Sequence, residues 1–204
     1  MHETLSIDAN TGLLIGARQV LSPHADERPP GVPPALLVVH GISLPPGEFG
    51  GPWIDRLFCG NLGSNLGSNL GTSPTAASNL TSARQPDFSA IAGLRVSAHA
   101  VIRRGGEITQ YVPFGARAWH AGESSYQGRA ACNDYSVGIE LEGTDLTAYT
   151  DAQYDSLAQL IRALCAAYPT LSTARLVGHS DIAPGRKTDP GAAFDWPRLR
   201  AMLA

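Results

Sequence analysis

The stretch VGIELEG, residues 137–143, decides the fold class because apolar and polar side chains alternate along it. This period of two predicts a β-strand with one buried face. Glu140 and Glu142 share the opposite face of that strand. Two interpretations of the pair remain open. They are solvated residues on an exposed sheet face, or neighbouring carboxyls that repel each other and raise one pKa, as a general base needs.

Further strands are predicted on both sides of this stretch. Upstream, ALLVVH (residues 35–40) is a short apolar run typical of a buried strand. Residues 95–113 alternate on either side of Gly105-Gly106, and this glycine pair favours a hairpin. Downstream, RLVGHSD (residues 175–181) predicts a last short strand.

Helical spacing marks three other segments. Thr150 and Gln153 form a capping-box pattern at the start of a helix that extends to about Tyr168. WIDRLF (residues 53–58) predicts one or two helical turns, and FDWPRLRAML (residues 194–203) predicts a terminal helix. Together with the strands, these segments predict an α/β (α+β) fold with a central mixed β-sheet flanked by helices.

We expect a single domain over residues 1–204, since this length suits one hydrophobic core. Residues 1–34 are expected to form an N-terminal arm. Residues 61–86 are expected to be a flexible insertion, because the unit NLGS recurs there and such residues bury little apolar surface.

Composition narrows the classes of function. The net charge is -3 and no run of lysine or arginine occurs, so we expect no nucleic-acid partner. No apolar stretch reaches the roughly 20 residues that span a bilayer, so we expect no membrane association. The first residues lack a secretory signal pattern, and the three cysteines are widely spaced. We therefore expect a cytoplasmic monomer.

Three residues with metal-binding side chains follow strand ends or lie in a turn. His40 ends the apolar run VVH, His179 follows LVG, and Asp189 precedes Pro-Gly. Two histidines and a carboxylate, with a fourth position open to water, are typical of a catalytic zinc site. The spacing alone also fits two hydrogen-bonding histidines and a simple turn. Lys187 is similarly either a solvated loop charge or a cation that stabilises an oxyanion.

Four stretches together resemble the AmpD-type N-acetylmuramoyl-L-alanine amidases, zinc enzymes related to phage lysozyme-type amidases and to peptidoglycan recognition proteins. The stretches are LLVVHGISLPPGEFGGPWIDRLF (36–58), LRVSAHAVIRRGGEITQYVPFGARAWHAGESSYQGR (94–129), CNDYSVGIELEGTD (132–145) and GHSDIAPGRKTDPGAAFDW (178–196). The similarity extends from about residue 22 to residue 200 and implies the amidase fold.

The resemblance assigns roles to five of these residues. It implies that His40, His179 and Asp189 are ligands of Zn²⁺. It also implies that Glu140 is the catalytic acid and base, and that Lys187 stabilises the transition state.

The implied reaction is zinc-dependent hydrolysis of the amide between N-acetylmuramoyl, in its 1,6-anhydro form, and L-alanine. The substrate would be an anhydro-muropeptide released from peptidoglycan during cell-wall recycling, and Arg95, Trp119 and His120 would contact it. The alternative function is a module that binds or senses peptidoglycan fragments without turnover.

Overall fold

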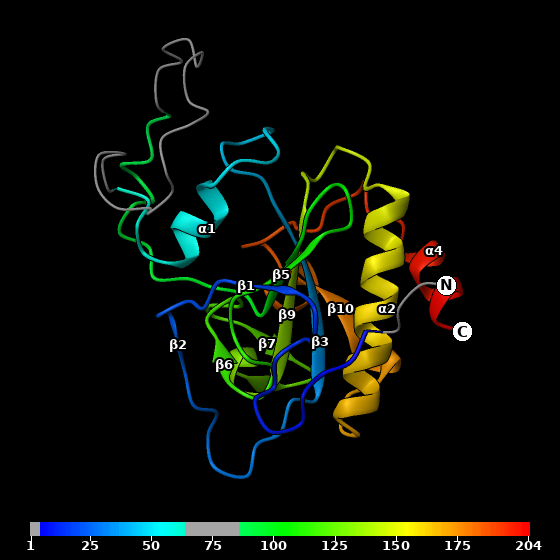
Figure 1. Ribbon diagram of the computed structural model, residues 1–204. Helices are drawn as coiled ribbons and strands as arrows, with labels where there is room; N and C mark the ends of the chain where they lie inside the picture. Colours follow the sequence, from blue (N-terminus) through cyan, green and yellow to red (C-terminus); the bar gives the residue numbers. More distant parts are fainter. Residues whose placement is uncertain (1–4, 64–85) are drawn as a thin grey trace.

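The computed structural model describes residues 5–63 and 86–204. A mixed six-stranded β-sheet forms its centre (Figure 1). In the order in which they lie across the sheet, the strands are β1 (Arg18–Gln19), β5 (Ile108–Gln110), β4 (Ala100–Ile102), β9 (Ser136–Glu142), β3 (Leu36–Ile42) and β10 (Leu176–Gly178). The strands β4, β9, β3 and β10 run parallel, whereas β5 is antiparallel to β4. The predicted mixed sheet and the hairpin within it are confirmed.

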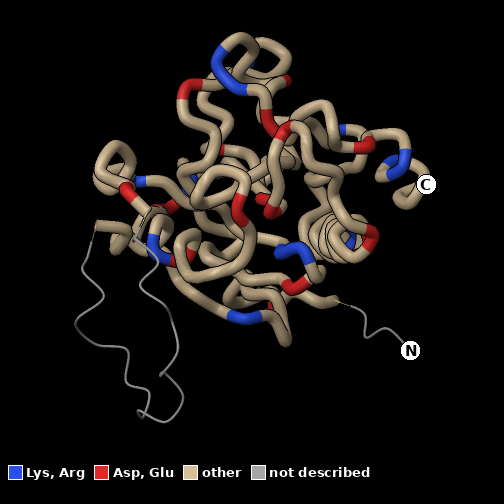
Figure 2. The backbone as a smooth tube through the Cα atoms, turned by 90° about the horizontal axis from the view of Figure 1, so that it is seen from above, with Lys and Arg blue, Asp and Glu red and all other residues tan. Residues whose placement is uncertain are grey.

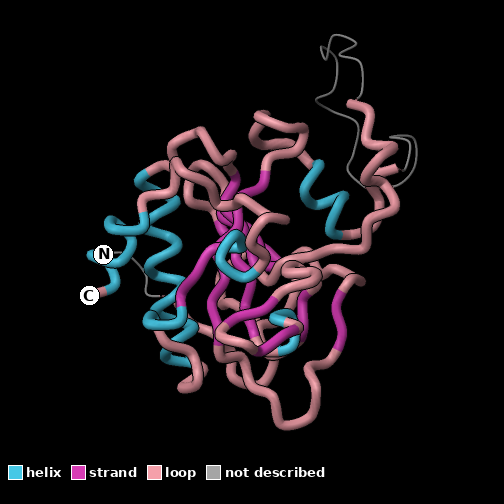
Figure 3. The backbone as a smooth tube through the Cα atoms, turned by 180° about the vertical axis from the view of Figure 1, so that it is seen from behind, coloured by secondary structure: helices cyan, strands magenta, loops and turns pink. Residues whose placement is uncertain are grey.

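Helices flank this sheet on both sides (Figure 1), as the sequence predicts. They are α1 (Trp53–Phe58), α2 (Asp151–Ala167), α3 (His179–Ile182) and α4 (Trp196–Leu203), with short 3-10 helices η1 (Cys132–Asp134) and η2 (Thr173–Arg175). The helices α2 and α4 lie on one side and α1 lies on the other. Two small antiparallel pairs are β2 (Ala25–Asp26) with β6 (Arg117–Ala118), and β7 (Ser125–Tyr126) with β8 (Arg129–Ala130). Loops make up most of the covering on the α1 side (Figure 3).

The alternation along β9 sorts its side chains between the two faces of the sheet. Val137, Ile139 and Leu141 are fully buried in one apolar cluster with Leu157 and Ile161 of α2. Burying an aliphatic side chain of this size stabilises the fold by about 1.5–3 kcal/mol. The predicted apolar face of this strand is thereby confirmed, and the opposite face is left for polar side chains.

The start of α2 shows why the sequence predicts the beginning of this helix correctly. The Thr150 hydroxyl accepts a hydrogen bond from the Gln153 backbone N–H at 3.2 Å. In return, the Gln153 side-chain oxygen accepts the Thr150 backbone N–H at 3.0 Å. This reciprocal capping box satisfies two backbone donors that a helix start would otherwise leave unpaired.

The last strand is shorter than the predicted segment 175–181. β10 ends at Gly178, and His179 already belongs to the single turn α3. The Asp181 carboxylate accepts the Gly178 backbone N–H at 2.7 Å, so it caps the start of a helical turn. His179 therefore sits at the junction of a strand and a helix.

The segment predicted as an N-terminal arm contributes an edge strand, because Arg18 in β1 pairs with Thr109 in β5. Most of the predicted insertion, residues 64–85, lies outside the described residues. Leu62, near the start of the predicted insertion, is buried in an apolar cluster with Phe58.

Charged residues of both signs are interspersed along the described chain (Figure 2). Among the described residues, no helix combines the length and the apolar character that crossing a membrane requires.

Candidate metal centre and active-site cleft

Parallel strand pairing brings the candidate residues to one edge of the sheet. β3 pairs with β9 so that His40 lies opposite Glu140. Neighbouring strands lie about 4.8 Å apart, so these two side chains project from adjacent positions. β10 flanks β3 on the other side, and His179 follows its last residue. In open α/β sheets, ligands bind at this carboxyl edge of parallel strands.

Three side-chain atoms converge at this edge. The Nδ1 atoms of His40 and His179 are 3.0 Å apart. The Asp189 Oδ2 atom lies 3.2 Å from the first and 3.1 Å from the second. A tetrahedral zinc ion has protein ligands at about 2.0–2.2 Å, which places neighbouring ligand atoms a little over 3 Å apart. The observed triangle therefore has the size of a zinc ligand set.

The second nitrogen of each histidine is already occupied. His40 Nε2 lies 3.0 Å from His120 Nδ1, and His179 Nε2 lies 3.2 Å from the Ala121 carbonyl oxygen. A carbonyl can only accept, so His179 Nε2 carries the proton and Nδ1 carries the lone pair. With Asp189, this arrangement turns acceptor atoms toward one point, which is the chemistry of a cation site.

Burial controls the charges around the cluster. Desolvation lowers the pKa of His40 to about 4, against a smaller opposing effect of Asp189, so the ring is neutral at neutral pH. Burial acts to raise the pKa of Asp189, but its close contacts with the His179 and His40 rings outweigh this effect and hold it below its usual range. Neutral imidazoles and an ionised carboxylate are the forms that bind a metal ion.

Glu140 and Lys187 face the same small cleft, of about 230 Å³, as the metal-binding cluster. The Glu140 Oε2 atom is buried without a hydrogen-bond partner among the described residues. Burial raises the pKa of this carboxyl well above its ordinary value of 4.5, and repulsion from Asp189 adds to the effect. The nearby Lys187 ammonium acts in the opposite direction. A carboxyl held in this way can accept and return a proton.

The three predicted substrate contacts lie in different surroundings. Trp119 and His120 line the cleft, whereas Arg95 is exposed and only its neighbours Leu94 and Val96 line it. Both ring nitrogens of His120 already face protein partners. The substrate contacts of these three residues stay predictions.

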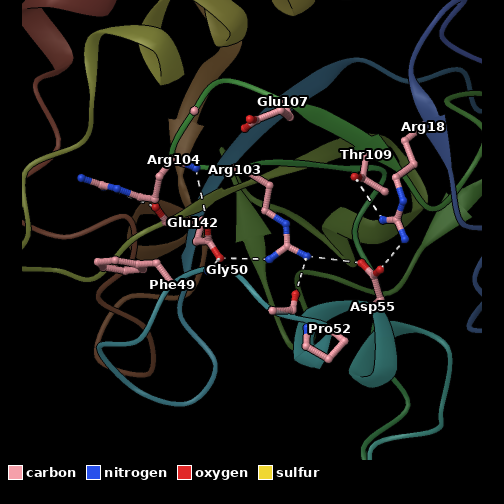
Figure 4. A pocket seen from close by; sticks show the side chains of 12 residues that line it. Arg18, Phe49, Gly50, Pro52, Asp55, Arg103, Arg104, Glu107, Thr109 and Glu142 are labelled. Atoms are coloured by element: carbon pink, nitrogen blue, oxygen red, sulfur yellow. Dashed lines mark hydrogen bonds and ion pairs between the residues drawn. The ribbon is translucent and has the colours of Figure 1, made fainter. Parts of the chain in front are cut away.

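Glu142, on the same face of β9, belongs to a different environment. It borders a second pocket, of about 710 Å³ (Figure 4). Its carboxylate accepts from Arg103 at 2.9 Å and from the Gly50 N–H at 2.5 Å. Arg103 also contacts Asp55 on α1, which pairs with Arg18 at 2.6 Å. Glu142 thus ties α1 and a loop to the sheet, and the interpretation of the pair as solvated on an open face is wrong.

Two residues that support the cluster from behind were not predicted from the sequence. Ser136 and Gly138 share the polar face of β9 with Glu140, at intervals of two residues. The Ser136 hydroxyl lies 3.0 Å from His120 Nε2. The period of two that singled out Glu140 could have included these two positions, but small residues gave no chemical signal by themselves.

Comparisons with known proteins agree with this geometry. The family model for N-acetylmuramoyl-L-alanine amidases matches residues 30–192. The chain belongs to this amidase family. The predicted enzyme class, a hydrolase of a carbon–nitrogen bond, is thereby confirmed.

Two amidases of this family illustrate the likeness in sequence. The 1,6-anhydro-N-acetylmuramyl-L-alanine amidase AmpD of Salmonella typhimurium strain SL1344 is 59% identical over 193 residues, which cover 95% of this chain and 93% of that protein. The protein of the same name from Escherichia coli K12 is 58% identical over 193 residues, 95% of each chain.

Solved amidase structures show the same fold. The crystal structure of a selenomethionine AmpD derivative matches with a TM-score of 0.82 at 56% identity, covering 97% of this chain and 99% of that one. AmpDh3 from Pseudomonas aeruginosa, in complex with an anhydromuramic pentapeptide, matches with a TM-score of 0.54 at 26% identity. It covers 83% of this chain and 59% of that one.

Proposed function

We propose that this amidase hydrolyses, with Zn²⁺, the bond between 1,6-anhydro-N-acetylmuramoyl and L-alanine in peptidoglycan fragments during cell-wall recycling. The observation that carries the proposal is the triangle of His40, His179 and Asp189 beside the carboxyl of Glu140, whose buried Oε2 has no partner among the described residues. The AmpD relatives, which match over nearly the whole chain, support the anhydro-sugar and the L-alanine.

Three residues would hold the zinc ion: His40 and His179 through Nδ1, and Asp189 through a carboxylate oxygen. When bound there, zinc supplies Lewis-acid polarisation of the attacking water and of the scissile carbonyl. The buried imidazoles and the carboxylate give the site a net charge of about +1 with Zn²⁺, which favours developing negative charge.

Glu140 carries the proton transfers. Its carboxylate takes a proton from the water as the water oxygen bonds to the lactyl carbonyl carbon. The carbon–nitrogen bond then breaks, and Glu140 returns the proton to the departing amine of L-alanine. The products are a free muramoyl carboxylate and a peptide with a free amino terminus, so atoms and charge balance.

Lys187 stabilises the oxyanion that forms on the carbonyl oxygen during attack. Its exposed side chain lines the cleft and forms no ion pair within the described part of the chain, so the ammonium is available. A group that stabilises an oxyanion typically contributes about 10²–10³-fold to turnover.

The test is cleavage of 1,6-anhydro-N-acetylmuramoyl tripeptide by the purified zinc-loaded chain, with products identified by mass spectrometry. We expect release of the anhydro-sugar and the tripeptide, loss of activity after chelation, and loss of activity in Glu140→Gln. Binding of the fragment without cleavage would instead support a sensing module. Faster cleavage of intact sacculi than of the soluble fragment would contradict the recycling assignment.

We also propose that the chain acts as a cytoplasmic monomer. All three of its cysteines are free thiols, which suits a reducing compartment. Cell fractionation and light scattering of the purified protein test the two parts of this proposal separately.

A further inference from the structure

The side chain of His120 lies directly behind the metal-binding cluster. Its Nδ1 atom is 3.0 Å from His40 Nε2, and its Nε2 atom is 3.0 Å from the Ser136 hydroxyl. The Ser136 hydroxyl in turn lies 2.6 Å from the Cys132 carbonyl oxygen. These contacts form one continuous chain from the back of His40 to a backbone carbonyl.

The direction of each hydrogen bond in this chain follows from its last member. A carbonyl only accepts, so the single hydroxyl proton of Ser136 is donated to Cys132. Ser136 must then accept from His120 Nε2. A neutral His120 that donates through Nε2 accepts through Nδ1, so His40 donates through its own Nε2. The lone pair of His40 is consequently on Nδ1, toward Asp189 and His179.

The backbone around His120 is fixed as well. The Asn133 side-chain oxygen accepts the backbone N–H of His120 at 3.1 Å and of Ala121 at 2.8 Å. The Ala121 carbonyl is the acceptor for His179 Nε2. One short segment therefore holds the outer nitrogens of both histidines of the cluster.

The strand β9 is shaped to admit this ring. A Cβ atom at Gly138 would overlap the imidazole of His120, with Nδ1 only 2.5 Å away. Ser136, Gly138 and Glu140 follow one another on the same face of β9. One strand face thus contributes the hydroxyl that orients His120, the space for its ring and the carboxyl of the cleft.

We propose that His120 is a positioning residue that, oriented by Ser136 and Asn133, fixes His40 in the tautomer whose Nδ1 faces the metal site. The inference rests on the proposed function in that Zn²⁺ is the ion held there. This role in metal affinity takes the place of the substrate contact expected for His120.

The decisive comparison is His120→Asn against His120→Leu. These side chains have nearly the same shape, and the Asn oxygen lies where Nδ1 of histidine would lie, so only Asn can accept from His40. Losing an orienting partner of a metal-bound histidine typically weakens metal affinity by about 10–100-fold. We expect that loss for Leu and near-parental affinity for Asn, measured by competition with a chromophoric chelator. Equal zinc affinity of the two variants would overturn the proposal.

A second readout does not depend on zinc affinity. In the parent chain, long-range ¹H–¹⁵N spectra of the imidazoles should show His120 protonated at Nε2 and unprotonated at Nδ1. The opposite tautomer would overturn the proposal even if the variants failed to fold.

Ser136→Ala should weaken zinc binding in the same direction as His120→Leu. Its matched control is Ser156→Ala, which also removes one hydroxyl bonded to a backbone carbonyl, at 2.7 Å from Gly106 and away from the cluster. We expect parental zinc affinity in this control. If the parent chain itself bound no zinc, the proposed function would fail, whereas the tautomer of His120 would still be testable.

Discussion

Glu140 and Glu142 point to the same side of β9, yet replacing each by glutamine should shift stability in opposite directions. Glu142 is 2% exposed and accepts from Arg103 and Gly50, so its charge is compensated. Glu140 has a buried oxygen without a partner in the described chain, so its charge is not compensated. The same isosteric change therefore removes a stabilising charge at one position and an uncompensated one at the other.

The magnitude for Glu142→Gln follows from its contacts. The ion pair with Arg103 becomes a hydrogen bond between the charged guanidinium and a neutral amide, which weakens this contact. The new amide also faces the Arg104 N–H, which lies 3.4 Å from Glu142 Oε2 and loses its acceptor, for about 1–3 kcal/mol. The Arg104 loss alone lowers Tm by about 2–12 °C for a chain of this size.

For Glu140→Gln, the sign follows from the raised pKa. Burial raises the pKa of the folded carboxyl above the value of 4.5 that it has when exposed. The unfolded chain then loses this proton at lower pH than the folded chain, so ionisation destabilises the folded state above about pH 4.5. In the metal-free protein, the glutamine variant should be more stable than the parent at pH 7. This gain should disappear as the pH falls to 4.5.

Urea denaturation of both variants at pH 7 and pH 4.5, after chelation, measures these effects. Turnover of the zinc-loaded proteins distinguishes the two variants further. Glu140→Gln should be inactive, whereas Glu142→Gln should keep its zinc and its turnover. A Glu142→Gln variant as stable as the parent would show that the pocket of Figure 4 is not held by this ion pair. A destabilised Glu140→Gln at pH 7 would refute the assignment of an uncompensated carboxyl.

Three further predictions concern the metal, the cleft and the fold. Chelation should lower Tm and added zinc should restore it, because a ligand that binds only the folded state stabilises it by about 2.7 kcal/mol at 100 times its Kd; calorimetry with and without chelator measures this. Lys187→Met should keep its zinc, assayed by metal analysis, and lose about 10²–10³-fold in kcat, and unchanged kcat would rule out the oxyanion role. Thr150→Ala should cost about 1 kcal/mol in denaturant titrations through loss of the α2 cap, with activity retained.

The sequence predicts best those elements whose signals are local. The alternation along β9 and the capping box at Thr150 are both patterns of residues a few positions apart in the sequence, and both are confirmed. The end of β10 is less predictable, because the carboxylate of Asp181 turns the chain at Gly178 through a contact that no hydropathy pattern contains.

Site residues follow the same division. His40 is recognisable because a histidine interrupts an apolar strand, and its role was supported further by the family resemblance. The difference between Glu140 and Glu142 is not visible in sequence, since it depends on Arg103, which is nearly forty residues away. Similarly, the place of His120 behind His40 depends on the pairing of distant strands.

The register of β3 against β9 explains why the stabilising and destabilising features of the site occur together. The pairing that sets His40 opposite Glu140 also sets Val38 opposite Gly138, two residues earlier in both strands. The missing side chain at Gly138 admits the ring of His120, which supports His40 from behind. A shift of β9 by one residue would move Glu140 to the α2 face of the sheet. The apolar packing of one face of β9 therefore fixes the register. The polar face of the strand can then carry a carboxyl whose burial disfavours its charge.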